Sequence, residues 1–583
     1  MSEIGIVVLA VAVWLGALVA APVPLVPAAG VVLLSLALRR PAGLVMGAAL
    51  LACALGASAW AGLEAPASRA VRGAVVLVSD PVEVGHSLRV DARLGDRRVE
   101  AWARGPAAGA LHDRLAGEVV SIEGRLRAPP ANARGRLAVR HIASRLDIAR
   151  VGGWHRGSFA STAANGLRLV LQRGASSMRP DRRALLSGFL LGDTRDLPPP
   201  VEADFRASGL THLLAVSGQN VAFVLAVAGP VLRRLRLRGR LGGSLAVIAF
   251  FAVVTRAEPS VLRASAMAAL ACWSAFAGRP VSRLRVLSLA VTALVLIDPM
   301  LPRSVGFQLS VGASIGLALL AAPIAARLGG PRWLADPLAV TIAAQIGVAP
   351  VLITTFGGLP LVTLAANLVA VPVAGPLTAW GLTAGFVAGL AGGRVAVVLD
   401  LPTGLMVGWI EGVARIAARV PLGLIDGHAL LAAASVAAGA AAVSWVAPRV
   451  RGIVVWAPLL ALVIAARPAA GAVSDRELAH GAHLWRAGAT VLVLDAGADS
   501  ARLLDGLRRA GVRRIDLVVA RSGSRDVASV LVDLRARVPT RAIAAPPGAR
   551  IRDATVVSRP VTVRIGQLTV RLAPRGQVLE VAV

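Results

Sequence analysis

The chain contains no lysine and no tyrosine, and only two of its 583 residues are cysteine. All 62 basic residues are therefore arginine, which fits the codon bias of a GC-rich genome better than a special requirement for guanidinium groups. Cys53 and Cys272 both lie in apolar segments, so neither a disulfide framework nor a thiolate metal site is predicted. No Gly-x-x-x-x-Gly-Lys loop occurs, and the sequence therefore predicts no nucleotide-driven motor within this chain.

Apolar residues make up 56% of the chain, and many uncharged runs reach the roughly 20 residues that cross a bilayer. This pattern predicts a polytopic α-helical membrane protein. The apolar stretch from Ile4 has no basic residues ahead of it and is followed by further spans, which favours a retained anchor over a cleaved signal. Part of the net charge of +30 orients the loops, and part could attract the phosphates of a polyanion.

Hydropathy and turn patterns divide the chain into five regions. They are N-terminal transmembrane helices at 1–63, a soluble region of short strands that fits a small β-barrel at 64–152, an amphipathic linker at 153–206, a transmembrane domain at 207–466 and a soluble α/β domain at 467–583. Spans are expected near 4–20, 23–38, 43–62, 208–230, 241–256, 261–277, 285–300, 304–323, 336–356, 361–391, 428–446 and 451–466.

Two stretches of the transmembrane domain depart from simple spans. Pro372 and Pro376 interrupt 361–391, which is expected to form two short or broken helices. The segment 400–420 is expected to lie on the membrane surface, because its charged residues share one helical face. With these assignments, an even number of crossings separates the arginine-rich loops. One topology then places those loops in the cytoplasm and both soluble regions outside.

Polar side chains cluster where one span begins. His212, Ser217, Gln219 and Asn220 enter an apolar stretch together, and in hydrocarbon each must find a protein or water partner. The cluster therefore either lines a cavity or joins helices through hydrogen bonds. Arg263 lies inside another span, where Glu258 and a phosphate in a pore are equally suitable partners.

These segments occur in a colinear order that resembles the signature of the ComEC competence proteins, the inner-membrane channels for transforming DNA. The resemblance covers about 185 to 390. The matching segments are Gly192-Asp193, Phe205, Gly209, His212, Leu214-Ala215-Val216-Ser217-Gly218, Glu258-Pro259-Ser260-Val261-Leu262-Arg263-Ala264 with Met267, Asp298-Pro299, Gly306-Phe307-Gln308-Leu309-Ser310, Ala344-Gln345 with Pro350, Phe356-Gly357, and Ala366-Asn367-Leu368 with Val371-Pro372.

The resemblance implies a multi-pass protein of the bacterial inner membrane that carries single-stranded DNA into the cytoplasm during natural transformation. The implied partners are single-stranded DNA, membrane lipid, a cytoplasmic helicase-type motor and an extracytoplasmic DNA receptor; no cofactor is expected, and a homo-oligomer is left open. Several of the implied residues also have packing interpretations, such as a helix cap at Asp193. Those assigned to a DNA path or pore lining are Asp193, His212, Ser217, Gln219, Asn220, Arg263, Gln308 and Asn367.

The soluble region at 64–152 resembles the OB-type barrel of the same family through Gly117–Gly124, Leu126 and Pro129. Such barrels bind single strands through phosphate contacts and base stacking, although a plain spacer is the alternative. The candidate strand-binding residues are Arg89, Arg93, Arg97, Arg98, Trp102, Arg125 and Arg127.

The C-terminal region resembles a metallo-β-lactamase-like domain through its strands at 492–497 and 516–519. In the active form the second strand leads into a His-x-His-x-Asp-His metal cluster, but this chain reads Ala-Arg-Ser-Gly-Ser-Arg-Asp from Ala520. The resemblance therefore implies a degenerate domain without metal and without enzymatic activity. Arg521 and Arg525 stand where ligands would be and suggest at most a phosphate contact.

Three alternatives stay open at the level of sequence. A membrane-bound nuclease would degrade the non-transported strand, but the missing metal cluster argues against it. A small-solute transporter would fit broken helices near Pro372 and Pro376. A scaffold that has lost transport is the third.

Overall fold

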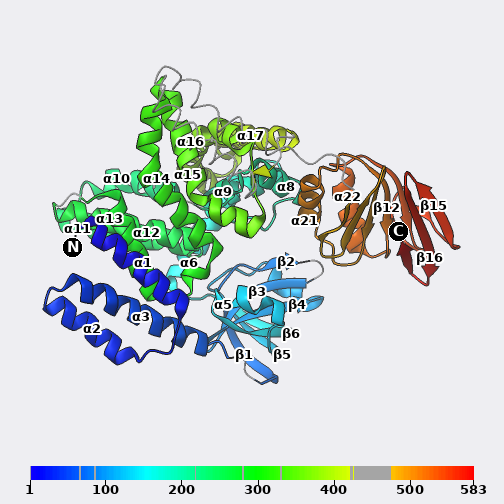
Figure 1. The fold of residues 1–583 in the computed structure, drawn as a ribbon. Helices are drawn as coiled ribbons and strands as arrows, with labels where there is room; N and C mark the ends of the chain where they lie inside the picture. The colour runs from blue at the N-terminus through cyan, green and yellow to red at the C-terminus, as the bar shows by residue number, and fades with distance from the viewer. Residues whose placement is uncertain are drawn as a thin grey trace, which may run out of the picture. The chain divides into compact units, whose positions relative to one another are not determined.

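The computed structural model describes residues 2–64, 67–84, 87–216, 218–278, 281–328, 331–420, 424–425 and 474–583 (Figure 1). The chain divides into two compact units. Unit 1 comprises Met1–Asp196, His212–Thr355 and Leu368–Ile410, and unit 2 comprises Leu197–Thr211, Phe356–Asn367 and Glu411–Val583. The expected spans at 428–446 and 451–466 lie outside the described residues, as does Ser217.

The prediction of a multi-pass membrane protein is confirmed by the length and composition of the helices. In the described part of the chain, six helices are long and apolar enough to cross a membrane, and three shorter helices are also apolar. The six are α3 (Pro41–Ala61), α11 (Leu237–Val254), α14 (Val305–Leu328), α15 (Arg332–Phe356), α16 (Thr363–Ala391) and α17 (Gly393–Arg419). The three shorter ones are α1 (Glu3–Val19), α2 (Leu25–Ala37) and α10 (Gly218–Leu232).

The helices α16 and α17 differ from their sequence-based expectations. The stretch that contains Pro372 and Pro376 forms one continuous helix rather than two broken ones. The segment 400–420, expected on the membrane surface, lies almost entirely within α17, which is apolar enough to span. Since α16 and α17 together provide two helices where two crossings were counted, the expected orientation of the later loops is unchanged.

Two tryptophans explain how the proline-containing helices α16 and α17 stay paired. The indole Nε1 of Trp380 on α16 donates a hydrogen bond to the Leu399 carbonyl at 3.2 Å, and that of Trp409 on α17 donates to the Val369 carbonyl at 3.1 Å. Leu399 lies one helical turn before Pro402 of α17, and Val369 lies one helical turn before Pro372 of α16. At both places the proline removes a backbone donor from its helix. The bonds are therefore reciprocal, and each helix supports the other beside its proline.

The linker helices α6 (Phe159–Gly174) and α7 (Pro180–Leu191) pack against α16. A Cβ atom at Gly174 would lie 2.2 Å from the Gly385 carbonyl oxygen, and one at Gly389 would lie 1.9 Å from the Val170 carbonyl oxygen. Only glycine permits this backbone contact between α6 and α16. The part of the amphipathic linker that forms α6 and α7 therefore belongs to the helical assembly of unit 1.

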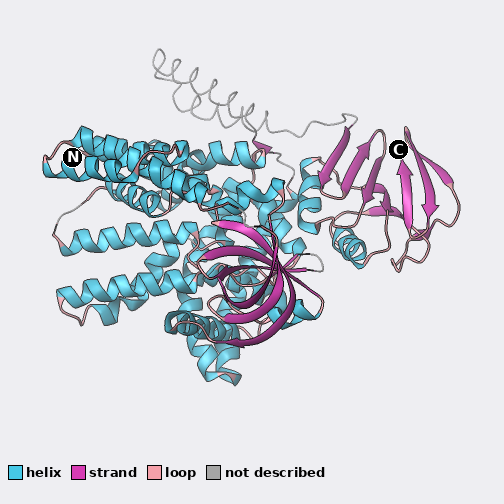
Figure 2. Ribbon diagram, turned by 90° about the horizontal axis from the view of Figure 1, so that it is seen from below, coloured by secondary structure: helices cyan, strands magenta, loops and turns pink. Residues whose placement is uncertain are grey.

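A strongly curved six-stranded sheet follows α3 in unit 1 (Figure 2). The strand order is β1-β5-β6-β4-β3-β2, β1 pairs additionally with β3, and β4 and β6 run parallel while the other pairs are antiparallel. The strands are β1 (Arg69–Leu77), β2 (Val82–Val84), β3 (Ser87–Leu94), β4 (Arg97–Arg104), β5 (Val119–Arg127) and β6 (Ile142–His155). Alternate residues such as Val90, Ala101 and Leu146 form the core that α4 (Pro106–His112) covers with Ala107 and Leu111. Below, this sheet with α4 and the loops between its strands is called the β domain.

Unit 2 contains a layered α/β domain at residues 474–583. Its six-stranded sheet has the order β14-β13-β12-β11-β10-β9, parallel from β11 to β14 and antiparallel from β9 to β11. Helices α21 (Ser500–Arg509) and α22 (Arg525–Arg535) pack on one apolar face, and a three-stranded sheet covers the other (Figure 2). The strands are β9 (Ser474–Ala479), β10 (Ala482–Arg486), β11 (Thr490–Leu494), β12 (Ile515–Ala520), β13 (Thr540–Ala545), β14 (Thr555–Val556), β15 (Val561–Ile565), β16 (Leu568–Arg575) and β17 (Val578–Ala582). Sheets are thus confirmed here, and the metallo-β-lactamase likeness stays a prediction.

Candidate functional site

Segments of the predicted signature meet where α10 and α12 (Pro259–Phe276) begin. The Asn220 Nδ2 on α10 donates to the Phe189 carbonyl on α7 at 3.1 Å, and the amide side chain is buried. The Ser260 Oγ on α12 donates to the Val216 carbonyl at 2.9 Å. Polar side chains of the signature therefore join α7, α10 and α12 through main-chain carbonyls, as interhelical hydrogen bonds do in membranes.

Arg263 extends this centre to α14. Its side chain is 9% exposed, its Nε donates to the Ser310 Oγ at 2.6 Å, and its Nη1 lies 3.0 Å from the Met267 Sδ. A guanidinium carries five N–H donors, and these two contacts use two of them. Among the residues that the structure describes, no carboxylate lies within ion-pair distance of Arg263. We call Asn220, Ser260, Arg263 and Ser310 the polar centre.

Glu258, the acidic partner considered for Arg263, lies instead beside Gly192 and within the influence of the Arg168 charge. Its carboxyl lies beside Gly192, where a Cβ atom would be 3.4 Å from the Glu258 Oε1. Burial raises the pKa of Glu258 to about 7, and the positive charge of Arg168 opposes this rise. Near neutral pH the side chain is therefore close to the midpoint of its titration.

A second group of charges lies next to Glu258 and joins the β domain to the helices. It consists of Asp80, Arg168, Asp193, Arg195 and Arg256, and we call it the ionic cluster. Arg168 is 2% exposed, and its Nη2 contacts the Asp80 Oδ2 at 3.0 Å and the Asp193 Oδ2 at 2.8 Å. Arg256 binds Asp80 through two hydrogen bonds of 3.0 and 2.6 Å, and Arg195 binds Asp193 through two of 2.8 Å.

The ionic cluster draws on four separate segments of unit 1. Asp80 follows β1, Arg168 lies on α6, Asp193 and Arg195 follow α7, and Arg256 precedes α12. Burial alone raises the pKa of Asp193, but the hydrogen bonds and charge of Arg195, with the charge of Arg168, outweigh it and hold the pKa at about 2. Burial likewise opposes ionisation of Asp80, and the charges of Arg168 and Arg256 still lower its pKa. Both carboxylates are therefore ionised at neutral pH.

Sequence reasoning placed Asp193 in a DNA path, and the structure places it in the buried ionic cluster, where its side chain is 6% exposed. The reasoning missed Asp80, Arg168, Arg195 and Arg256. One signal was available for Arg168, which takes an apolar position of α6 together with Ala164 and Leu171, both buried. A charge at such a position needs buried partners.

The other predicted path residues that the structure describes have surroundings of their own. His212 is exposed on the short helix α9 (Thr211–Leu214), and Gln219 is exposed on the first turn of α10. The Gln308 Nε2 donates to the Pro302 carbonyl at 2.7 Å. Asn367 is buried on α16, within unit 2, and its Oδ1 has no hydrogen-bond partner among the described residues.

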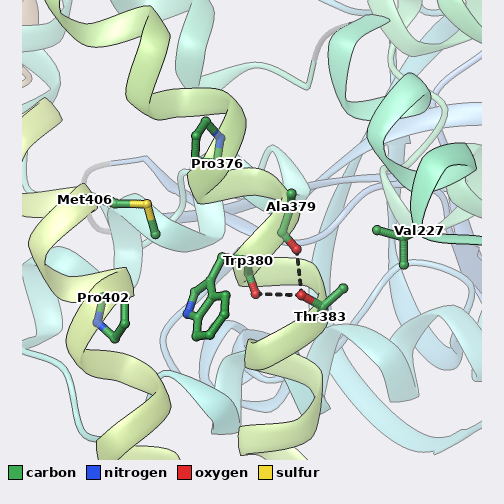
Figure 3. A pocket seen from close by; sticks show the side chains of 7 residues that line it. All are labelled: Val227, Pro376, Ala379, Trp380, Thr383, Pro402 and Met406. Atoms are coloured by element: carbon green, nitrogen blue, oxygen red, sulfur yellow. Dashed lines mark hydrogen bonds between the residues drawn. The ribbon is translucent and has the colours of Figure 1, made fainter.

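An apolar pocket of about 420 Å³ lies between α10, α16 and α17 (Figure 3). The Thr383 hydroxyl donates to the Ala379 and Trp380 carbonyls of its own helix, so its proton is used within α16 (Figure 3). Its lining residues are Val227, Pro376, Ala379, Trp380, Thr383, Pro402 and Met406.

In the β domain, the register brings predicted residues from three strands onto one face. Arg89 pairs with Trp102, Trp102 with Asp147, and Asp147 with Arg125. The Trp102 ring lies 4.7 Å from the guanidinium of Arg145, which sequence reasoning did not select. The remaining predicted arginines are exposed: Arg93, Arg97, Arg98, Arg125 and Arg127.

In the C-terminal domain, Arg521 follows β12 directly and forms an ion pair with Asp495, which follows β11. The Arg521 Nη1 lies 2.7 Å from the Asp495 Oδ2, and the Nε donates to the Leu579 carbonyl at 3.4 Å. The position where a metal cluster would begin thus holds a guanidinium bound to a carboxylate.

Comparison with known proteins identifies the region that holds the polar centre. A family model described as "Competence protein" matches residues 189–451. This region of the chain belongs to the competence protein family. The match includes Asp193, Arg195 and Arg256 of the ionic cluster and all four residues of the polar centre.

Relatives of the competence type match parts of the chain. The "Competence protein ComA" of Neisseria gonorrhoeae is 28% identical over 404 residues, which are 63% of this chain and 54% of that protein. The "ComE operon protein 3" of Bacillus subtilis (strain 168) is 27% identical over 200 residues, 34% of this chain and 25% of that protein. The "Uncharacterized protein YcaI" of Escherichia coli (strain K12) is 29% identical over 228 residues, which are 36% of this chain and 29% of that protein. The matches thus cover less than two thirds of each relative, and no solved structure matches the chain.

Proposed function

We propose that the protein carries single-stranded DNA across the bacterial inner membrane during natural transformation. The polar centre is the observation that carries this proposal, because the competence family region assembles it from α10, α12 and α14. A buried guanidinium bound by a hydroxyl and a thioether keeps a positive charge that a passing phosphate can approach. The other predicted path residues, including His212 and Gln219, would contact the strand before or after this point.

The β domain would receive the strand outside the membrane as an OB-type barrel. Its strand order supports this, since β1 pairs with both β5 and β3 and since β4 and β6 are parallel. The exposed arginines would bind phosphates weakly and in a salt-dependent way. Stacking would depend on Trp102, whose ring Arg145 already contacts on one side.

Both soluble domains would lie outside the cytoplasm. The arginine-rich loops support this orientation through the positive-inside rule. Within unit 2, β7 (Leu359–Pro360) pairs with β8 (Leu424–Ile425), so the residues after α15 and those after α17 emerge on one side. A cytoplasmic helicase-type motor would then supply the pulling force, and an extracytoplasmic receptor would supply the DNA.

The C-terminal domain would not cleave DNA. The Arg521–Asp495 pair supports this, because it takes up a carboxylate that a metal would need. The small-solute alternative loses the argument from broken helices, because α16 is continuous through Pro372 and Pro376.

Substitution of the polar centre tests the proposal. Asn220→Ala and Arg263→Ala should each lower transformation by at least about a hundredfold, while full-length protein stays in the membrane. Arg327→Ala is the matched control, since Arg327 is exposed at the end of α14 and, within the part of the chain that the structure describes, bonds to the Pro323 carbonyl of its own helix. Normal transformation by both polar-centre variants would contradict a role of this centre in conduction.

A further inference from the structure

The helix α8 (Pro199–Ser208) completes the apolar core of the C-terminal domain, although more than 260 residues separate them in sequence. Ala203 is 1% exposed and belongs to the same buried cluster as Leu503, Leu504 and Leu507 of α21. Both elements belong to unit 2, and Figure 1 shows α8 beside α21. The helical face of this domain is thus occupied by a segment from the middle of the chain.

Polar contacts fix α8 in this position. The Arg537 Nη2 lies 2.8 Å from the Asp204 Oδ2, and these side chains are 23% and 11% exposed. The same Nη2 donates to the Pro200 carbonyl at 3.4 Å, and the Arg508 Nη1 donates to the Ala203 carbonyl at 3.2 Å. Two arginines of the C-terminal domain therefore hold both the side chain and the backbone of α8.

The end of α8 is fixed as well. Gly209 follows the helix with a φ of +73°, and a Cβ atom there would lie 2.0 Å from the Thr363 Oγ1 at the start of α16. Glycine is required for both the backbone conformation and the close approach. The helix α10, which carries Asn220, begins at Gly218, nine positions after Gly209.

We propose that the C-terminal domain is a positioning domain, which holds α8 and thereby the segment that leads into α10 and the polar centre. This inference rests on the proposed function, because the segment is held for passage of the strand. It gives the domain a role that requires neither metal nor cleavage. Arg537 is a positioning residue in this scheme, since it acts through Asp204 and α8.

Reversal of the charge pair tests the proposal in the full-length membrane protein. Arg537→Glu places two carboxylates together and should release α8, so that uptake of labelled DNA falls at least about tenfold. The double variant Asp204→Arg with Arg537→Glu should restore uptake to within about threefold of the wild type. Arg535→Glu is the matched control, because Arg535 lies on α22 and pairs with Asp553 rather than with α8.

Trypsin cleavage after Arg206 reports directly on α8 and does not depend on transport. Cleavage should be faster in Arg537→Glu than in the wild type and slow again in the double variant, in parallel with uptake. Faster cleavage with unchanged uptake, or cleavage that the charge reversal does not alter, would overturn the positioning role. Failure of the proposed function has a different result, namely uptake that stays at the wild-type level in a strain that lacks the protein.

Discussion

The two soluble domains are joined to helices from other parts of the chain in chemically different ways. The β domain is attached through the ionic cluster, in which Asp80 binds Arg168 and Arg256 with little exposure to solvent. The C-terminal domain is attached through the apolar face of α8 and one ion pair, Asp204–Arg537. A buried network of charges tolerates no missing member, whereas an apolar face loses stability in proportion to the area removed. The first junction should therefore depend far more steeply on single residues than the second.

The largest loss of stability from a single substitution is expected at Arg168. Arg168→Met leaves Asp80 and Asp193 buried without their shared guanidinium, and should destabilise the protein by roughly 3–5 kcal/mol. Thermal unfolding of the purified protein in detergent measures this loss. The control is Arg179→Ala, which removes an exposed ion pair with Asp181 and should cost roughly 0–1 kcal/mol. Equal effects of the two substitutions would contradict a special dependence of the β-domain junction on its buried charges.

Acid should weaken the β-domain junction through Asp193. Its pKa lies at about 2 in the folded protein and near 3.8 when unperturbed, so its charge stabilises the fold fully above the higher value. This stabilisation is lost as the pH falls toward 2. The free energies of unfolding of the wild type and of Asp193→Asn, measured from pH 7 down to pH 2.5, should differ most at neutral pH. This difference should shrink as the pH falls below about 4. A difference that stays constant over this range would exclude an ionised Asp193 as the stabilising species.

The hydrogen bonds between α16 and α17 join uncharged groups, and their removal is expected to cause the smallest loss of stability. Trp380→Phe removes the hydrogen bond to the Leu399 carbonyl and should destabilise the protein by about 0.5–1.5 kcal/mol. Trp409→Phe removes the reciprocal bond to the Val369 carbonyl and should have a similar effect. If either loss approached that of Arg168→Met, uncharged contacts would matter as much as the ionic cluster.

The sequence was sufficient to predict most of the helices and to select residues that meet in space. Hydropathy located α1 to α3, α11, α12, α13 (Arg283–Ile297), α14 and α15, because each is built on an apolar run with few charges. The signature segments located Asn220 and Arg263, and the structure brings their surroundings together through Phe189, Val216 and Ser310. The spacing of residues within one segment was therefore enough to locate the helices and the signature residues.

Contacts between distant segments could not be predicted in the same way. Asp80 and Arg256 are 176 positions apart, and no local pattern links them. The prolines of α16 favoured a broken helix in the sequence, and the indole that supports this helix beside Pro372 comes from Trp409 of α17. Ala203 resembled part of an amphipathic linker, and its place in a core depends on residues about 300 positions later.

The most direct test of the proposed function follows labelled DNA in a strain that lacks this protein. Such cells should bind DNA at their surface but bring none of it into the cytoplasm in a nuclease-protected form. The wild-type gene should restore internalisation, and the Arg263→Ala gene should not. Internalisation at wild-type levels in the deletion strain would contradict the proposal.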